Sequence, residues 1–443
     1  MLSPPRSLVR RTVRCRLLLA AALASAALVA AGAVHAAAVV VVPGAASSYV
    51  DLPRFEASRA NTGIAIHDID DPGLLDAVRD AGFSFVRTDL FWEAVETPAG
   101  WDFSKYDALV ANLAERGLGA LFILGYQHPL HSPRQPPTTP AQLAAFHAYV
   151  SQSALRYRHD AVRFEVWNEQ NHPTYWLAAP SAAGYRNLLK TAVQAIRQTN
   201  PAAQVAMGGV QQIDRSFIRA VGDISAGARY APDAVSVHPY RQGNPETALD
   251  DYRALRRDLS AYRRVPEIWA TEWSYPSVGY AYVSDLADGH APRARARQAT
   301  YAARRLLVDW IAQLGLSAYY DIRDDGPDPK NMEHNFGLLD AQGEPLPAYV
   351  AVKRLFAFTA HAARAAYRMD PAGRYIVLRL SNGAATRYVV WCYGQGNAVT
   401  VDLSRLPPAE AAATDLYGTP RAAHDGLVTL REDQGPLYIG PDG

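Results

Sequence analysis

The chain has 443 residues and is 49% hydrophobic, which is enough for a large core in one long barrel domain or in two or three smaller domains. Its formal net charge is +1, and residues 1–36 contain five arginines and no acidic residue, so removing those five charges leaves −4. This weakly acidic balance, without a basic stripe, argues against a nucleic-acid partner.

The N-terminus has the pattern of an export signal. An arginine-rich segment precedes apolar or small residues at 17–34, and residues 34–36 offer a cleavage site with small residues. Apolar residues continue through 37–42, and a stretch of this length can also span a membrane. We therefore expect residues 1–45 to be a cleaved signal peptide or a retained inner-membrane anchor, and the protein to be periplasmic or secreted.

From residue 62 onward, short apolar runs alternate with amphipathic helical patterns. The runs that predict strands are 62–66, 83–86, 118–124, 162–167, 204–207, 234–237, 267–273 and 316–320. Helix starts between them are marked by Asp71-Pro72 and by the capping box Thr139-Pro140-Ala141-Gln142. Eight strand–helix units over about 260 residues predict a parallel (β/α)₈ TIM barrel, whose active site lies at the carboxyl ends of the strands.

After a helical pattern at 349–358 the character of the sequence changes. Short apolar runs are separated by Gly, Asn and Pro, and they lie at 375–380, 387–393, 398–403, 426–430 and 437–439. This pattern predicts a small all-β, sandwich-like domain. We expect the barrel to occupy residues 46–360 and the C-terminal β-domain residues 361–443.

Two of the predicted barrel strands end in a glutamate. Asn168-Glu169 follows the fourth strand and Thr271-Glu272 ends the seventh, and these strands face each other across an eight-stranded barrel. Two carboxyl groups at one sugar ring supply the acid/base and the nucleophile or base of glycosidic bond cleavage. The acid must be protonated near neutral pH, which requires apolar surroundings or the other carboxylate to raise its pKa. Two unrelated glutamates that cap loops are the alternative, but Asn168 and the flanking tryptophans favour a catalytic pair.

Other polar and aromatic side chains at or after the strand ends are candidates for substrate binding. They are His67, Arg87, Trp92, Tyr126, Asn168, Trp176, His238, Tyr240, Trp273 and Tyr320. Glu165 is expected to be an ion-pair partner of Arg87 or Arg163 inside the barrel. The acidic residues at 67–71 lack a recognised ligand spacing, so no metal and no other cofactor are expected. The arginine-rich run at 293–305 is expected to be a solvated helix face.

The motifs Trp167-Asn168-Glu169 and Thr271-Glu272-Trp273, each at the end of a strand, resemble the clan A glycoside hydrolases. The resemblance implies that Glu169 is the acid/base, that Glu272 is the nucleophile and that the anomeric configuration is retained. It also implies that the sugar and the nucleophile are bound or oriented by Arg87, Asn168, His238 and Tyr240.

Further segments resemble family 39 of this clan. They are the stretch from Asn335 to Asp340, followed by residues 345–349, and the segment at 414–418 in the trailing β-domain. Chain length and the export pattern are similar to bacterial glycosidases encoded with exopolysaccharide synthesis, of the Psl type. The resemblance covers residues 60–440, with one departure: the clan usually has a tryptophan at the end of strand eight, where this chain has Tyr319-Tyr320-Asp321.

The resulting hypothesis is a retaining glycoside hydrolase that cleaves a β-linked polysaccharide or oligosaccharide. In one version of this hypothesis the enzyme is endo-acting, functions in exopolysaccharide biosynthesis or turnover, and has polysaccharide-synthesis proteins as partners. The alternative is an exo-acting β-xylosidase-like enzyme. Two other classes are a non-catalytic sugar-binding protein of a polysaccharide assembly and a periplasmic scaffold. The glutamate pair argues against both, because binding alone needs no such pair.

Overall fold

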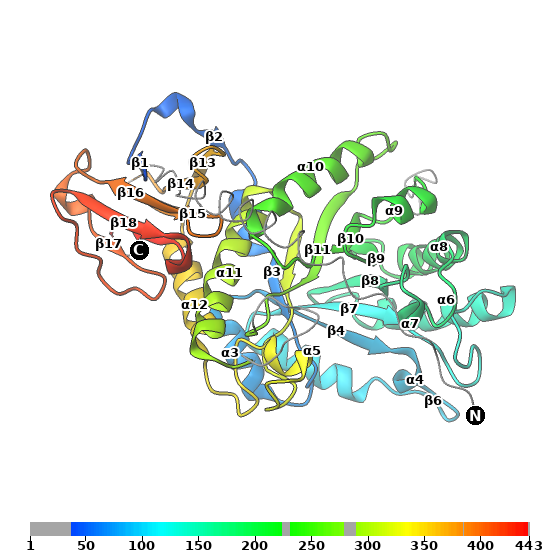
Figure 1. The fold of residues 1–443 in the computed structure, drawn as a ribbon. Coiled ribbons are helices and arrows are strands. Elements are labelled where there is room, and N and C mark those ends of the chain that lie inside the picture. Colours follow the sequence, from blue (N-terminus) through cyan, green and yellow to red (C-terminus); the bar gives the residue numbers. More distant parts are fainter. Residues whose placement is uncertain (1–36, 224–230, 279–288, 384, 442–443) are drawn as a thin grey trace, which may run out of the picture. The chain divides into compact units, whose positions relative to one another are not determined.

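The computed structural model describes residues 37–223, 231–278, 289–383 and 385–441. Its centre is a closed barrel of eight parallel strands in chain order (Figure 1). The strands are β3 (Thr62–Ala65), β4 (Phe85–Phe91), β7 (Gly119–Gly125), β8 (Val162–Asn168), β9 (Val205–Gln211), β10 (Ala234–His238), β11 (Glu267–Trp273) and β12 (Leu316–Tyr319). Because β12 pairs with β3, the barrel closes, and the predicted (β/α)₈ fold is confirmed.

Helices connect successive strands and lie around the outside of the barrel (Figure 1). The α-helices are α2 (Phe55–Ala60), α3 (Pro72–Ala81), α4 (Trp92–Val95), α5 (Ser104–Glu115), α6 (Pro140–Arg156), α7 (Pro173–Trp176), α8 (Ala182–Thr199), α9 (Arg215–Val221), α10 (Ala248–Leu259), α11 (Pro292–Ile311) and α12 (Pro347–Thr359). The Asp71 side chain accepts hydrogen bonds from the first turn of α3, and Thr139 and Gln142 form the capping box of α6. The local cap signals in the sequence therefore mark the true helix starts.

Short elements complete the barrel's connections. A small hairpin of β5 (Glu96–Thr97) and β6 (Gly100–Trp101) follows α4. Single turns of 3₁₀ helix lie at Ala46–Ser48, Pro245–Thr247, Met332–Asn335, Pro408–Glu410 and Glu432–Gln434.

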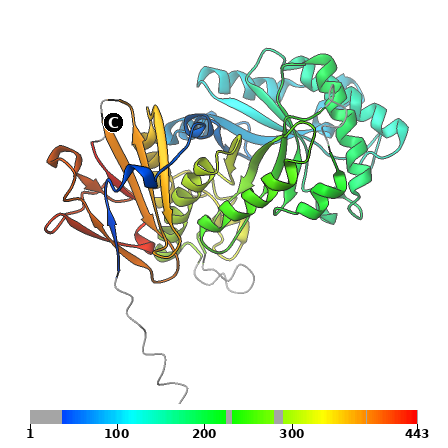
Figure 2. The ribbon, with the colours of Figure 1, turned by 90° about the horizontal axis from the view of Figure 1, so that it is seen from above.

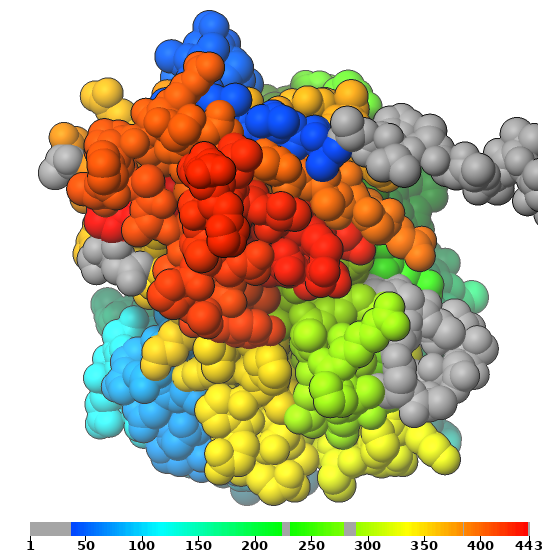
Figure 3. All heavy atoms as spheres, turned by 60° about the vertical axis from the view of Figure 1, so that its left-hand side comes forward, coloured from blue at the N-terminus to red at the C-terminus, as the bar shows by residue number. Residues whose placement is uncertain are grey.

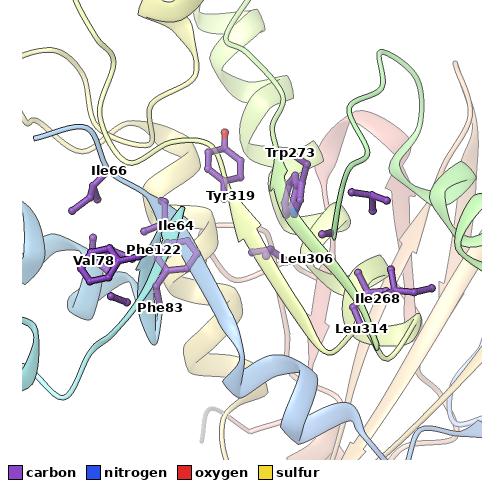
Figure 4. Close-up of a cluster of buried hydrophobic side chains, with 14 of the residues drawn as sticks. Ile64, Ile66, Val78, Phe83, Phe122, Ile268, Trp273, Leu306, Leu314 and Tyr319 are labelled. Atoms are coloured by element: carbon purple, nitrogen blue, oxygen red, sulfur yellow. The ribbon is translucent and has the colours of Figure 1, made fainter. Parts of the chain in front are cut away.

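The core of the barrel lies between its strands and the surrounding helices (Figure 4). Ile64 of β3 and Phe122 of β7 are fully buried, as are Val78 of α3 and Leu306 of α11. Helices α3 and α11 pack against the strands through apolar faces, and each fully buried side chain of this size stabilises the fold by about 1.5–3 kcal/mol. A rigid barrel therefore holds the strand ends that carry the polar side chains.

The C-terminal β-domain contains two sheets. One has the strand order β17-β19-β15-β14-β13-β2 and the other has the order β1-β16-β18. The strands are β1 (Ala38–Val41), β2 (Val50–Asp51), β13 (Arg364–Asp370), β14 (Tyr375–Ser381), β15 (Thr386–Cys392), β16 (Ala398–Asp402), β17 (Ala413–Thr414), β18 (Leu427–Arg431) and β19 (Leu437–Ile439). Figure 2 shows these orange and red strands with the blue N-terminal strands beside them. A small all-β domain after the barrel is thus confirmed.

The β-domain also uses residues that precede the barrel, which corrects the predicted boundary at residue 46. Strand β2 pairs with β13, and β1 lies beside β16. Val40 and Val42 are fully buried. Sequence patterns report local structure and cannot show that an early strand completes a sheet formed more than 300 residues later. Residues 1–36 of the leader predicted at 1–45 lie outside the described residues. None of the helices in the described part has the length and apolar character of a membrane span.

We expect the start point of a shortened chain to decide its stability. A protein that begins at residue 37 keeps β1. One that begins at residue 46 lacks β1 and both buried valines, Val40 and Val42, so the pockets that these side chains fill become empty. Loss of two fully buried valines predicts a decrease of roughly 3–6 kcal/mol in the free energy of unfolding. Urea denaturation of the two proteins measures the difference, and equal midpoints would show that β1 contributes nothing.

The arginine-rich run on α11 is a solvated face only at its start, where Arg293 is exposed, and this corrects another prediction. Arg304 and Arg305 are buried, and each pairs with a buried carboxylate: Arg304 Nη2 lies 2.6 Å from Glu246, and Arg305 Nε lies 2.8 Å from Asp309. The indole of Trp391 in β15 also donates to Glu246, at 2.8 Å. This network joins the β-domain to the barrel, and Figure 3 shows the orange and red residues packed against the yellow-green α11 region. The buried partner of Arg304 comes from another element, whereas that of Arg305 lies one turn further along α11.

Candidate active site

Glu169 and Glu272 meet at the carboxyl-terminal end of the barrel. Glu169 directly follows β8, where its backbone N–H donates to the carbonyl oxygen of Gly209 at 2.9 Å, and Glu272 is the penultimate residue of β11. One carboxylate oxygen of each glutamate and one ring nitrogen of His238 all lie within 4.8 Å of one another. Both carboxylates are largely buried, with 8% and 15% of their side chains exposed. The two side chains can therefore reach one small group at the same time.

Glu272 is surrounded by groups that favour its ionised form. Arg87 Nη1 donates to Oε2 at 2.6 Å, and the hydroxyl of Tyr240 donates to Oε1 at 3.0 Å. Burial raises the pKa of Glu272, but His238, Arg87 and the Tyr240 hydrogen bond outweigh it, so the net pKa shift is downward. This carboxylate stays charged at pH values at which an ordinary glutamate begins to protonate.

Arg87 donates hydrogen bonds to three other side chains of the site. It is buried in β4 and donates through Nε to Glu165 at 2.9 Å, through Nη1 to Glu272 and through Nη2 to Asn168 at 2.8 Å. Glu165 also accepts from Thr271 at 2.7 Å, so the expected interior ion pair of Glu165 and Arg87 is confirmed. Burial lowers the pKa of Arg87, but these carboxylates reverse the shift, and the guanidinium stays charged. Its planar fork fixes the positions of several acceptors together.

His238 links the two glutamates. Its Nδ1 lies 3.0 Å from Glu169 Oε1 and 3.7 Å from Glu272 Oε1, and its Nε2 lies 3.3 Å from Arg87 Nη2. Arginine only donates, so Nε2 accepts and Nδ1 carries the hydrogen that is donated to Glu169. Burial lowers the pKa of His238, but Glu272 and Glu169 outweigh it and the net shift is upward, whereas the contact with Arg87 favours the neutral ring. The ring fits because residue 209 is glycine: a Cβ there would lie 1.9 Å from Nε2.

Two further groups of the site were missed by sequence reasoning. Gln211 Nε2 donates to Glu169 Oε2 at 3.2 Å, and Asp89 accepts from the Tyr126 hydroxyl at 2.7 Å. Burial raises the pKa of Asp89, against the opposing effects of Tyr126 and Arg87. Strand periodicity could have found Asp89, because it follows Arg87 by two residues and so lies on the same face of β4. The predicted strands ended too early, at residues 86 and 207, to include either residue.

His67 and Tyr320 lie together on the neighbouring strand ends β3 and β12. Their ring centroids are 5.4 Å apart, and the Tyr320 hydroxyl donates to Glu333 at 2.8 Å. The hydrogen bond from His67 Nδ1 to Asp325, at 2.7 Å, raises the pKa of His67, and the charge of Glu272 adds to the shift. Tyr320 directly follows β12, at the position where the sequence departs from the tryptophan expected in the clan. Its own ring is partly exposed.

Two groups in the described part of the chain have donor atoms close enough together to hold a metal ion. They are His67 with Asp321 and Asp325, and the His238 group with both glutamates. The hydrogen bonds of His67 and His238 account for both arrangements, and clusters of this kind occur without an ion. No metal is inferred from them.

Three tryptophans predicted to bind substrate do not line the site. Trp92 packs between His131 and Tyr149, Trp176 packs against Trp167 and Tyr185, and Trp273 packs against Tyr319 (Figure 4). Each has at most 1% of its surface exposed. The helices and loops outside the barrel cover these rings, and closeness to a strand end in sequence does not reveal that cover.

A comparison with known protein families identifies the family of this chain. The model of the family described as cellulase (glycosyl hydrolase family 5) matches residues 49–274, which is half of the chain. A search of curated proteins gives no significant match.

Solved structures share the fold. A family 39 glycoside hydrolase from Bacteroides cellulosilyticus WH2 matches with a TM-score of 0.70 at 22% identity, over 87% of this chain and 81% of that one. A family 39 β-xylosidase from Caulobacter crescentus matches with a TM-score of 0.63 at 18% identity, over 91% and 99%. A glucosidase from Croceicoccus marinus matches with a TM-score of 0.59 at 13% identity, over 89% and 97%. The chain belongs to the family described as cellulase (glycosyl hydrolase family 5), and it is a clan A glycoside hydrolase.

Proposed function

We propose that this glycoside hydrolase retains the anomeric configuration and works by double displacement with Glu169 and Glu272. The distance between the two carboxylates carries this proposal, because one oxygen of each lies within 4.8 Å of the other. Retaining enzymes place the two carboxyl groups about 5–5.5 Å apart, whereas inverting enzymes leave about 6.5–9.5 Å for a water molecule. The short separation leaves no room for water between the nucleophile and the anomeric carbon.

The first step forms a covalent intermediate. Glu272 attacks the anomeric carbon and forms the ester bond, while Glu169 gives its proton to the glycosidic oxygen and the leaving sugar departs with the bonding electrons. In the second step Glu169 takes a proton from water, whose oxygen attacks the same carbon and displaces Glu272. Two inversions at one carbon give net retention.

The neighbouring residues fit these roles. Arg87 and Tyr240 hold Glu272 ionised and oriented for attack. His238 and Gln211 fix the two oxygens of Glu169. Asn168, which the Arg87 guanidinium orients, is available to hydrogen-bond the sugar. Tyr126, His67 and Tyr320 line the same strand ends and serve as sugar contacts.

For the substrate, we propose a β-linked polysaccharide or oligosaccharide that is cleaved internally, as in the exopolysaccharide-associated glycosidases of the Psl type. The family 39 segments at 335–340 and 414–418 and the export pattern at 1–45 support this proposal, with the protein exported to the periplasm or secreted. An exo-acting β-xylosidase is the second candidate, which the fold of the Caulobacter crescentus β-xylosidase favours.

A product analysis tests the proposal. The purified protein is incubated with β-linked xylan, glucan and mannan oligosaccharides and with bacterial exopolysaccharides, and the products are sized. Internal cleavage yields oligosaccharides of several lengths, and exo-cleavage yields a single small sugar. Proton NMR during the reaction should show the β-anomer first. Initial formation of the α-anomer would refute retention, and the absence of cleavage would refute hydrolysis of these glycans.

The lowered pKa of Glu272 predicts a specific pH dependence. The acidic limb of kcat/KM reports ionisation of the nucleophile in the free enzyme, so a lowered pKa places this limb below the usual range of a glutamate. Tyr240→Phe removes a hydrogen bond to the charged form, so the pKa of Glu272 should rise and the limb should move to higher pH. A pH–rate profile measures the shift. Tyr417→Phe, which changes an exposed tyrosine of the β-domain, is the control, and an unmoved limb in Tyr240→Phe would refute the role of this hydroxyl.

A further inference from the structure

We infer that Phe91 and Tyr175 form a second sugar-binding subsite beside the two glutamates, which binds the next pyranose unit of the substrate. This inference rests on the proposed function and deepens it, because a site of this kind makes the enzyme selective for chains of two or more sugars.

Exposure singles out these two rings. Within the described residues the exposed phenylalanine, tryptophan and tyrosine side chains are Phe91, Trp101, Tyr175 and Tyr417, with 41%, 38%, 42% and 40% of their surface accessible. Two of these four line one pocket, although they come from β4 and α7, which are more than 80 residues apart. Exposed apolar rings that gather in one place mark a binding surface.

The pocket continues from the candidate active site. Its volume is about 330 Å³, and Asp89, Glu93, Tyr126 and Thr174 line it together with the two rings. Tyr126 and Asp89 are the hydrogen-bonded pair already described at the strand ends, and the Phe91 and Tyr126 ring centroids are 6.0 Å apart. A pocket of this size, lined by aromatic rings and a few polar groups, is typical of small-ligand sites.

The backbone holds Tyr175 close to Glu169. Tyr175 follows Glu169 by six residues, and its carbonyl oxygen accepts a hydrogen bond from the Trp167 indole at 3.0 Å. The Trp167 ring is buried in β8, so this hydrogen bond holds α7 against the strand that Glu169 directly follows. Burial raises the pKa of Tyr175 to about 12, and the charges of Glu169 and Glu272 contribute, which agrees with this closeness.

The chemistry of the pocket suits a sugar ring. A pyranose has an apolar face of C–H groups that packs on an aromatic ring, while its hydroxyls point outward around its edge. Phe91 and Tyr175 offer the apolar surface, and the carboxylates of Asp89 and Glu93 offer acceptors for hydroxyl hydrogens. The arrangement therefore has both kinds of contact that a neutral sugar unit needs.

Binding as a function of chain length tests the subsite without turnover. β-1,4-linked xylo-, cello- and manno-oligosaccharides of one to four units are titrated calorimetrically into Glu169→Gln protein. We expect one series to bind at least about tenfold more tightly once the chain reaches the second unit. Phe91→Ala and Tyr175→Ala, each in the same background, should reduce that gain by roughly five- to tenfold, the size expected for loss of one aromatic contact.

Conservative and distant variants serve as controls. Tyr175→Phe and Phe91→Tyr keep the rings and should keep the gain, and Trp101→Ala and Tyr417→Ala remove equally exposed rings elsewhere and should also keep it. Melting curves check that each variant is folded. A gain that survives both Phe91→Ala and Tyr175→Ala, or no gain with length in all three series, overturns the subsite.

The hydrolysis assay separates this inference from the proposed function. Cleavage by the unsubstituted protein without any length-dependent gain would leave the function standing and remove the subsite. A length-dependent gain that needs Phe91 and Tyr175, without cleavage, would leave the subsite standing and remove the hydrolysis.

Discussion

Replacement of Glu272 by alanine should abolish hydrolysis while the fold is retained. The substitution removes the proposed nucleophile, and loss of a covalent nucleophile predicts a decrease in kcat of at least about 10⁴-fold. In this variant Arg87 keeps its ion pair with Glu165 at 2.9 Å. The buried positive charge of Arg87 therefore still has a partner, and the fold should be retained. Steady-state kinetics on the substrate found in the product analysis measures the loss, and circular dichroism checks the fold.

A covalent label identifies the nucleophile directly. A 2-fluoro glycoside of the correct sugar should accumulate as an ester on Glu272, which peptide mass spectrometry can locate. Glu267 is the matched control because it begins the same strand and pairs with Arg54 at the far end of the barrel. Glu267→Ala should stay active, and a label on Glu267 would refute the assignment of Glu272.

Replacement of Glu169 by glutamine should slow the natural reaction by about 10²- to 10⁴-fold, the usual contribution of a general acid. Binding should persist, because the amide keeps the size of the side chain and its one carbonyl oxygen can still accept the hydrogen bond from His238. Activated substrates, whose leaving groups need no proton, should suffer less in the first step. Stopped-flow and steady-state rates on natural and activated substrates measure this difference.

An external nucleophile completes this test. Azide should restore turnover in Glu169→Gln, since it attacks the glycosyl–enzyme without needing a base, and the product should be the β-glycosyl azide. Glu115→Gln, which changes an exposed glutamate on α5, should behave as the unsubstituted protein does. Wild-type rates of Glu169→Gln on a natural substrate would mean that another group is the acid.

The closeness of Glu169 and Glu272 could be predicted because its signal is local. Strand β8 ends in Asn168 with Glu169 directly after it, and β11 carries Glu272 one residue before its end. In a parallel barrel all carboxyl ends lie on the same side, so position along a strand is enough to bring such residues together. The same reasoning identified Arg87, which donates to Glu272, and His238, which lies close to both glutamates.

Burial of the aromatic residues was decided by tertiary packing. Trp92 and Trp176 follow strand ends in the sequence as closely as Tyr175 or Tyr126 do, yet both tryptophans are buried and Tyr175 is exposed. The difference comes from which loops and helices cover each ring. The pattern of neighbouring residues carries no information about that cover.

The sequence alone therefore determined the barrel, the trailing β-domain and the glutamate pair, because strand periodicity, helix caps and strand-end motifs arise from residues close together in the chain. Only the tertiary structure decided that β1 completes a sheet with β16, that Arg304 is buried on Glu246, and that Phe91 and Tyr175 line one pocket. Each of these depends on contacts between residues that are tens to hundreds of positions apart. Such contacts form only when the whole chain packs, because burial and charge pairing depend on partners that no local pattern specifies.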